Sequence, residues 1–123
     1  MPLARSLAWP PASASFDTPG LRVEIHPGVP ATAEISGEID IASASWLRET
    51  LLLAIRRHGP AISVDLHGVT FLDCSGIGVL LATARRARLE GGGMRVVRPS
   101  AQAWHVITLL GLQHVLTRGH EHQ

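Results

Sequence analysis

The residues with the clearest chemical potential are a carboxylate, a thiol and a hydroxyl in succession: Asp73, Cys74 and Ser75. An extended apolar stretch precedes them, and the apolar residues that follow recur at helical spacing, namely Ile77, Leu80, Leu81, Ala84 and Ala87. The three side chains are therefore expected at the entrance of a helix. The first amides of a helix lack intrahelical partners and carry a partial positive charge, so this place favours an anion or an added phosphate.

The same stretch is also compatible with a purely structural role. Asp73 or Ser75 can cap the helix, and Gly76 and Gly78 can allow the helix to pack closely against its neighbours. Capping residues are common at helix starts, so the spacing alone leaves both interpretations open.

The patterns expected of an enzyme are missing from the sequence. Ser75 lacks the strand, Gly-x-Ser-x-Gly and helix setting of a hydrolase, and no glycine-rich loop carries a phosphate-binding lysine. His120 and His122 form a His-x-His pair without further ligands, which favours a solvated tail over a metal site. We therefore predict no catalytic residue, no metal site and no cofactor.

Around the central helix, the apolar pattern predicts a small α/β domain. Alternating apolar residues indicate strands at 21–25, 31–35, 61–66 and 94–97, with a short strand at 114–117 closing the sheet. One further helix is expected from a cap at Asp40 or Ser43 to the stop at 59–60, and another from Ser100 to Gly111. Strands that alternate with helices pair in parallel, so we expect a mixed β-sheet covered by helices, with an antiparallel hairpin at one edge.

Length and composition fit a single domain. The chain has 123 residues, and 46% of them are hydrophobic, which is enough for a core. We predict a flexible, proline-rich leader at 1–19, the domain at 20–118 and a frayed tail at 119–123. No apolar run reaches the roughly 18 residues of a membrane span, so no membrane insertion is expected. The single cysteine cannot form an internal disulfide, which suits a cytoplasmic location.

The positive charges are unevenly distributed. All 11 basic residues are arginine, and five of them lie between Arg85 and Arg98 with only Glu90 as an acidic neighbour. The net charge is only +1, and no aromatic residues lie among these arginines to stack on bases, so direct nucleic-acid binding is not expected. A solvated helix face, or a rim that steers an acidic protein partner, is the favoured interpretation of this basic patch.

Four segments resemble those of one protein family. The string FLDCSGIGVLL at 71–81 resembles the signature of the STAS domain, the family of anti-sigma factor antagonists. The turn GEID at 37–40 resembles the early Gly-Glu-Leu-Asp turn of that family. Residues 91–97 resemble its glycine-led fourth strand, and 100–116 resemble its closing helix, Leu-Gly-Leu turn and last strand. The likeness covers roughly 21–117 in the expected order and implies a single STAS-like domain.

The resemblance implies a non-catalytic partner-switching module. Antagonists of this family bind an anti-sigma factor with ATP-dependent serine kinase activity and so free a sigma factor, which regulates transcription indirectly. The alternative is a STAS accessory subunit of a membrane lipid or solute transporter, which docks an ATPase subunit. A nucleotide-binding or redox-sensing module is a third option. The implied partner-binding residues are Glu38, Asp40, Asp73, Cys74, Ser75, Gly76 and Ile77.

The two turns that hold these residues follow strand ends and are expected to converge at one end of the parallel sheet. We predict that a charged residue at Ile77 or a bulky residue at Gly76 abolishes partner binding and leaves the fold intact. We also expect Leu51, Leu80 and Ile107, which lie centrally on three helical apolar faces, to be core residues.

In antagonists of this family, phosphorylation of the residue directly after the motif's aspartate blocks binding to the anti-sigma factor. The sequence departs from the family at this phosphoacceptor position. Cys74 stands there and has no hydroxyl, whereas Ser75 matches the second hydroxyl residue of the motif. Three interpretations remain, in this order: the antagonist is unswitched, Ser75 has become the acceptor, or Cys74 is a redox switch at the helix entrance. Under the first interpretation, Cys74 can simply be a small residue that packs at the turn and has no chemical role.

Overall fold

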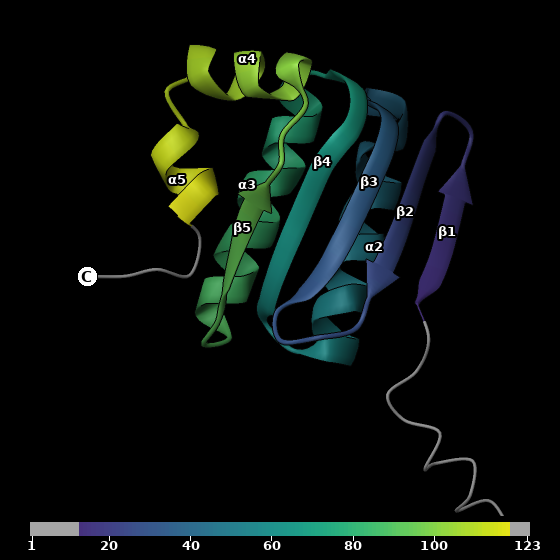
Figure 1. The fold of residues 1–123 in the computed structure, drawn as a ribbon, viewed down its shortest axis with the longest axis vertical. Helices are drawn as coiled ribbons and strands as arrows, with labels where there is room; N and C mark the ends of the chain where they lie inside the picture. The colour runs from purple at the N-terminus through teal and green to yellow at the C-terminus, as the bar shows by residue number, and fades with distance from the viewer. Residues whose placement is uncertain (1–12, 119–123) are drawn as a thin grey trace, which may run out of the picture.

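The computed structural model describes residues 13–118, which form one five-stranded sheet with helices packed against it (Figure 1). In chain order the elements are β1 (Ala14–Thr18), β2 (Leu21–His26), β3 (Ala31–Ile39), α2 (Ile41–His58), β4 (Ala61–Leu72), α3 (Cys74–Leu89), β5 (Gly93–Val97), α4 (Ala101–Leu109) and α5 (Gln113–Arg118). The strands also lie in chain order across the sheet. β1, β2 and β3 pair antiparallel, whereas β3, β4 and β5 pair in parallel. This is the predicted mixed α/β architecture.

The core lies between one face of the sheet and two long helices. α2 and α3 run side by side behind the sheet in Figure 1 and contact each other along their length. Leu51, Leu80 and Ile107 are fully buried, as the helical periodicity predicts. The opposite sheet face carries polar side chains on β2 and β3, because alternate residues of a strand point to opposite faces.

The predicted leader is wrong at its C-terminal end. Ala14–Thr18 forms β1, which pairs with β2 along its whole length. Phe16 is the one large apolar side chain of β1 and packs against the core, while its neighbours Ser15 and Asp17 are exposed. A polar edge strand with a single inward apolar residue lacks the alternation that would reveal it. Residues 1–12 of the predicted leader lie outside the described residues.

The predicted closing strand at 114–117 is also wrong, because this segment is helix α5. The backbone N–H of Leu116 donates to the carbonyl of Leu112 at 3.0 Å, which is a helical bond. Leu116 is buried, whereas its neighbour Val115 is exposed. Two adjacent apolar residues in so short a segment fit both the helical and the strand spacing, so the apolar pattern does not distinguish a strand from a helix. The predicted tail at 119–123 lies outside the described part of the chain.

Candidate protein-interaction site

The entrances of α2 and α3 lie next to each other at one edge of the sheet. β3 and β4 are parallel neighbours, so their carboxyl ends meet at the upper edge in Figure 1. The backbone N–H of Asp73 donates to the carbonyl of Ile39 at 3.3 Å, which joins the two strand ends directly. α4 lies across the same end, where Gln102 Nε2 donates to the carbonyl of Leu72 at 3.3 Å. The predicted convergence of the two turns is therefore observed.

Asp73 caps α3 with its own carboxylate. Its Oδ1 accepts hydrogen bonds from the backbone N–H groups of Ser75 at 2.9 Å and Gly76 at 3.3 Å. A negative charge at a helix N-terminus is favourable, and here the protein supplies that charge itself. The structural interpretation of Asp73 is thus correct, and two of the first amides of α3, those of Ser75 and Gly76, are already occupied.

The two residues that follow the cap differ in exposure. Cys74, the first residue of α3, is exposed and carries a free thiol. Ser75 is half-buried. The position where the family resemblance places a phosphoacceptor is therefore accessible to a partner surface or a modifying enzyme, although a cysteine side chain cannot form a phosphate ester.

Asp40 caps α2 through a reciprocal arrangement with Ser43. Asp40 Oδ1 accepts from the backbone N–H groups of Ala42 at 3.0 Å and Ser43 at 3.2 Å, and Ser43 Oγ accepts from the Asp40 N–H at 3.1 Å. Both capping residues predicted for this helix are therefore used. The exposed Glu38 lies beside this cap, and a hollow of about 220 Å³ is lined by Thr18, Pro19, Gly20, Glu38, Asp40, Ala42 and Ser43.

Gly76 and Ile77 are part of the packing beneath the site. A Cβ atom added to Gly76 would lie 2.4 Å from Leu72 Cδ1 and 2.7 Å from Ile39 Cγ2. Ile77 is only 4% exposed. A bulky residue at the first position or a charge at the second would therefore disrupt the core, so the prediction that such variants keep the fold is wrong. The sequence placed both residues at the helix entrance but could not show which way they face.

Two exposed apolar residues at this edge were missed by the sequence analysis. Ile41, the first residue of α2, is 82% exposed, and Phe71, near the end of β4, is 43% exposed. Phe71 is the register partner of Glu38, so it lies beside the end of β3. Ile41 lies off the apolar face that Leu47 and Leu51 define, and that mismatch was the available signal. We name the six residues Glu38, Asp40, Ile41, Phe71, Cys74 and Ser75 the entrance surface.

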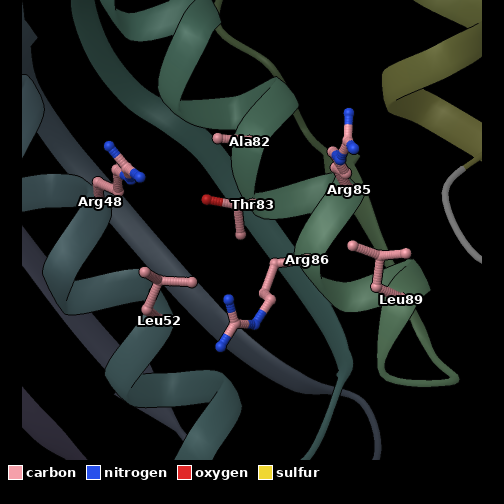
Figure 2. A pocket seen from close by; sticks show the side chains of 7 residues that line it. All are labelled: Arg48, Leu52, Ala82, Thr83, Arg85, Arg86 and Leu89. Atoms are coloured by element: carbon pink, nitrogen blue, oxygen red, sulfur yellow. The ribbon is translucent and has the colours of Figure 1, made fainter.

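A basic groove runs between α2 and α3 on their outer side (Figure 2). It has a volume of about 200 Å³ and is lined by Arg48, Leu52, Ala82, Thr83, Arg85, Arg86 and Leu89. Arg86 forms an ion pair with Glu90, one turn further along α3. Within residues 13–118, neither Arg48 nor Arg85 has an acidic ion-pair partner. Leu89 is 72% exposed at the end of the groove.

The sequence suggests that the five arginines between 85 and 98 form a single basic patch, but in the structure they do not. Arg85, Arg86 and Arg88 lie on α3, and the groove draws in Arg48 from α2 instead. Arg98 follows β5, and its Nε donates to Asp65 Oδ2 at 2.9 Å. Strand and helix carry neighbouring arginines to different sides of the sheet, which a linear count cannot reveal.

Comparison with known proteins identifies the family. The family model described as Mlab, STAS domain, matches residues 25–117. The chain is 29% identical over 82 residues to the anti-sigma-B factor antagonist of Bacillus subtilis, covering 67% of this chain and 74% of the relative. It is also 29% identical over 97 residues to the anti-sigma F factor antagonist of Paenibacillus polymyxa, covering 78% and 82%.

A solved structure agrees with these relatives. The crystal structure of an anti-sigma factor antagonist from Mycobacterium paratuberculosis superposes with a TM-score of 0.70 at 26% identity, covering 82% of this chain and 87% of the other. The chain therefore belongs to the STAS domain family. None of the helices in the described range is both long and apolar enough to cross a membrane.

Proposed function

We propose that the protein is a cytoplasmic, non-catalytic anti-sigma factor antagonist. It binds an anti-sigma factor that has ATP-dependent serine kinase activity, releases the sigma factor and so regulates transcription indirectly. The observation that carries the proposal is the entrance surface, where two helix N-termini and two exposed apolar side chains meet at one sheet edge. The relatives named as antagonists of anti-sigma factors support this choice of partner.

The entrance surface has the composition of a protein-binding site. Ile41 and Phe71 would supply apolar area that a partner can remove from water, and Glu38 and Asp40 would supply a polar, acidic rim. Exposed apolar residues at the centre of an interface usually contribute most of the binding energy. The partner is therefore expected to present an apolar pocket with basic residues around it.

The basic groove would extend the contact along the helical layer. A stable interface covers about 800 Å² on each partner. Arg48 and Arg85 have no acidic ion-pair partner in the described range, so they can pair with acidic groups on the anti-sigma factor. Charge complementarity of this kind mainly raises the association rate and fixes the orientation.

The switch is proposed to be absent at the usual position. Cys74 cannot accept a phosphate from a serine kinase, so the protein would remain competent to bind its partner. A shift of the acceptor to Ser75 and a redox switch at Cys74 are the second and third options. Cys74 is exposed, so a kinase could reach this position but would find no hydroxyl there. Ser75 has the hydroxyl but is half-buried, which makes it a poor kinase substrate.

The proposal is tested by calorimetry with the cognate anti-sigma factor. Ile41→Asp removes the most exposed apolar group of the site, and an acidic residue in the first turn of a helix preserves the fold. We expect Ile41→Asp and Phe71→Ala each to weaken binding at least about tenfold, equivalent to about 1.4 kcal/mol. Val29→Asp is the matched control, because Val29 is 92% exposed and lies before β3, at the opposite end of that strand.

Unchanged affinity in the folded Ile41→Asp and Phe71→Ala variants would reject the entrance surface as the binding site. Stable binding of the native chain to a transporter ATPase subunit, with no affinity for the anti-sigma factor, would instead establish the transporter accessory subunit.

A further inference from the structure

The open face of the sheet brings together one histidine and two glutamates that are separated in the sequence. Glu24 and His26 are two residues apart on β2, so their side chains lie on the same face. Glu34 on β3 is the direct register partner of Glu24. All three residues are half-buried. We name them the Glu-His-Glu cluster; it lies on the face opposite α2 and α3.

The distances within the cluster suit a metal ion. His26 Nε2 lies 3.1 Å from Glu34 Oε1 and 3.9 Å from Glu24 Oε1, and one ligand atom from each residue lies within 4.8 Å of the others. Ligands of a tetrahedral zinc ion at about 2.1 Å are separated from each other by about 3.4 Å. Small side-chain rotations would therefore bring all three atoms onto one ion.

The outer contacts of the cluster leave the right atoms available. Glu24 Oε2 accepts hydrogen bonds from Ser15 Oγ at 3.2 Å and Arg22 Nη2 at 3.3 Å, which leaves Oε1 for an ion. The hydrogen bonds from Arg22 and Ser15 therefore hold the Glu24 carboxylate in place through Oε2. Ser13 Oγ lies 2.8 Å from His26 Nδ1, an outer hydrogen bond of the kind that orients metal-binding histidines.

There is also an electrostatic reason for a cation and room for its water ligands. Two carboxylates directly opposite each other on neighbouring strands repel, and a cation between them relieves that repulsion. A hollow of about 220 Å³ lies beside the cluster and is lined by Arg22, Glu24, Glu34, Ile35, Ser36, His67 and Gly68. The ion can therefore reach the ligands and keep a bound water molecule.

We propose that Glu24, His26 and Glu34 form a zinc-binding site that is open to solvent. One imidazole nitrogen with two carboxylate oxygens suits Zn²⁺, whereas Mg²⁺ and Ca²⁺ prefer sites made only of oxygen ligands. These ligands come from two paired strands and form no local motif, so the sequence pattern alone does not indicate a metal site. The site is independent of the entrance surface and of the proposed function.

The test is titration of the full chain with zinc chloride, followed by calorimetry and by backbone NMR. We expect a first site of one ion per chain, with chemical shift changes centred on β2 and β3. Glu34→Gln keeps the size of the side chain and should weaken this site at least about tenfold. Arg22→Gln removes a competing positive charge and should strengthen binding. His67→Ala is the control, because His67 lines the same hollow without being a ligand.

Three results would overturn the proposal. The first is zinc affinity that is unchanged in both Glu34→Gln and His26→Gln, which would place the ion elsewhere, such as at Cys74 or the His120 and His122 pair. The second is an absence of shift changes on β2 and β3 at saturating zinc. Displacement of zinc by equimolar magnesium chloride would also contradict the assignment.

Discussion

At the scale of single residues, the proposed regulation depends on Cys74. The residue directly follows the helix cap at Asp73, is exposed, and stands where the family resemblance places a phosphoacceptor hydroxyl. A thiol at this position cannot form a phosphate ester with a serine kinase. The neighbouring Ser75 has the hydroxyl but is half-buried, and its N–H is bonded to the Asp73 carboxylate.

We expect the native protein to remain unphosphorylated after incubation with the cognate kinase and ATP, and Cys74→Ser to become phosphorylated. A phosphate adds about −1.5 to −2 charge beside the Asp73 carboxylate, and its desolvation in the apolar part of a closely packed interface is costly. The phosphorylated Cys74→Ser protein should therefore bind at least about tenfold more weakly than its unmodified form. Mass spectrometry and calorimetry on the same samples measure both effects.

Cys74→Ala is the control for this experiment, because it also removes the thiol but offers no hydroxyl. Phosphate found on Ser75 of the native chain would mean that the acceptor has moved by one residue. Binding that is lost with peroxide and restored by a thiol reductant would make Cys74 a redox sensor.

At the scale of elements, the three helical apolar faces hold the site in place. Leu51, Leu80 and Ile107 are fully buried on α2, α3 and α4. Truncation of any one to alanine should lower the free energy of unfolding by about 2 to 5 kcal/mol, measured by urea denaturation. Leu109→Ala is the matched control, because Leu109 lies on α4 and is 72% exposed, and it should change stability by less than about 0.5 kcal/mol. A change below about 1 kcal/mol at a buried position would contradict the packing described.

The sequence predicted long periodic elements and their caps better than short ones. Asp40, Asp73 and Ser100 all cap the helices for which they were proposed, because a side-chain oxygen before an apolar period is a local signal. β1 and α5 are held by contacts with the sheet and with neighbouring helices rather than by their own patterns. Their type therefore depends on tertiary packing, which the sequence alone does not display.

At the scale of the whole molecule, the candidate site could be placed from the sequence but not resolved. Parallel strands bring their carboxyl ends together, so the meeting of Asp40 and Asp73 could be expected. The exposure of the individual side chains could not be predicted. Gly76 and Ile77 are buried, whereas Ile41 and Phe71 are exposed. The basic groove likewise joins Arg48 to Arg85 across two helices far apart in the sequence.

The basic groove makes a prediction about association kinetics. We expect the double variant Arg48→Glu and Arg85→Glu to reduce the association rate with the anti-sigma factor by about tenfold at low salt, with a smaller effect on dissociation. The difference should shrink as ionic strength rises, because salt screens exposed charges. Arg95→Glu on β5 is the control, because Arg95 lies outside the groove. Equal association rates for the native chain and the groove variant, measured by surface plasmon resonance, would remove the groove from the interface.

The most direct test of the account is a release experiment with a preformed complex of the cognate anti-sigma factor and its sigma factor. The native protein is added in stoichiometric amounts with ATP, and free sigma factor is measured by size-exclusion chromatography. The account predicts that sigma factor is released and stays free over time, because Cys74 cannot be phosphorylated, and that Ile41→Asp releases much less. A complex that remains intact at a large excess of the native protein would contradict the central claim.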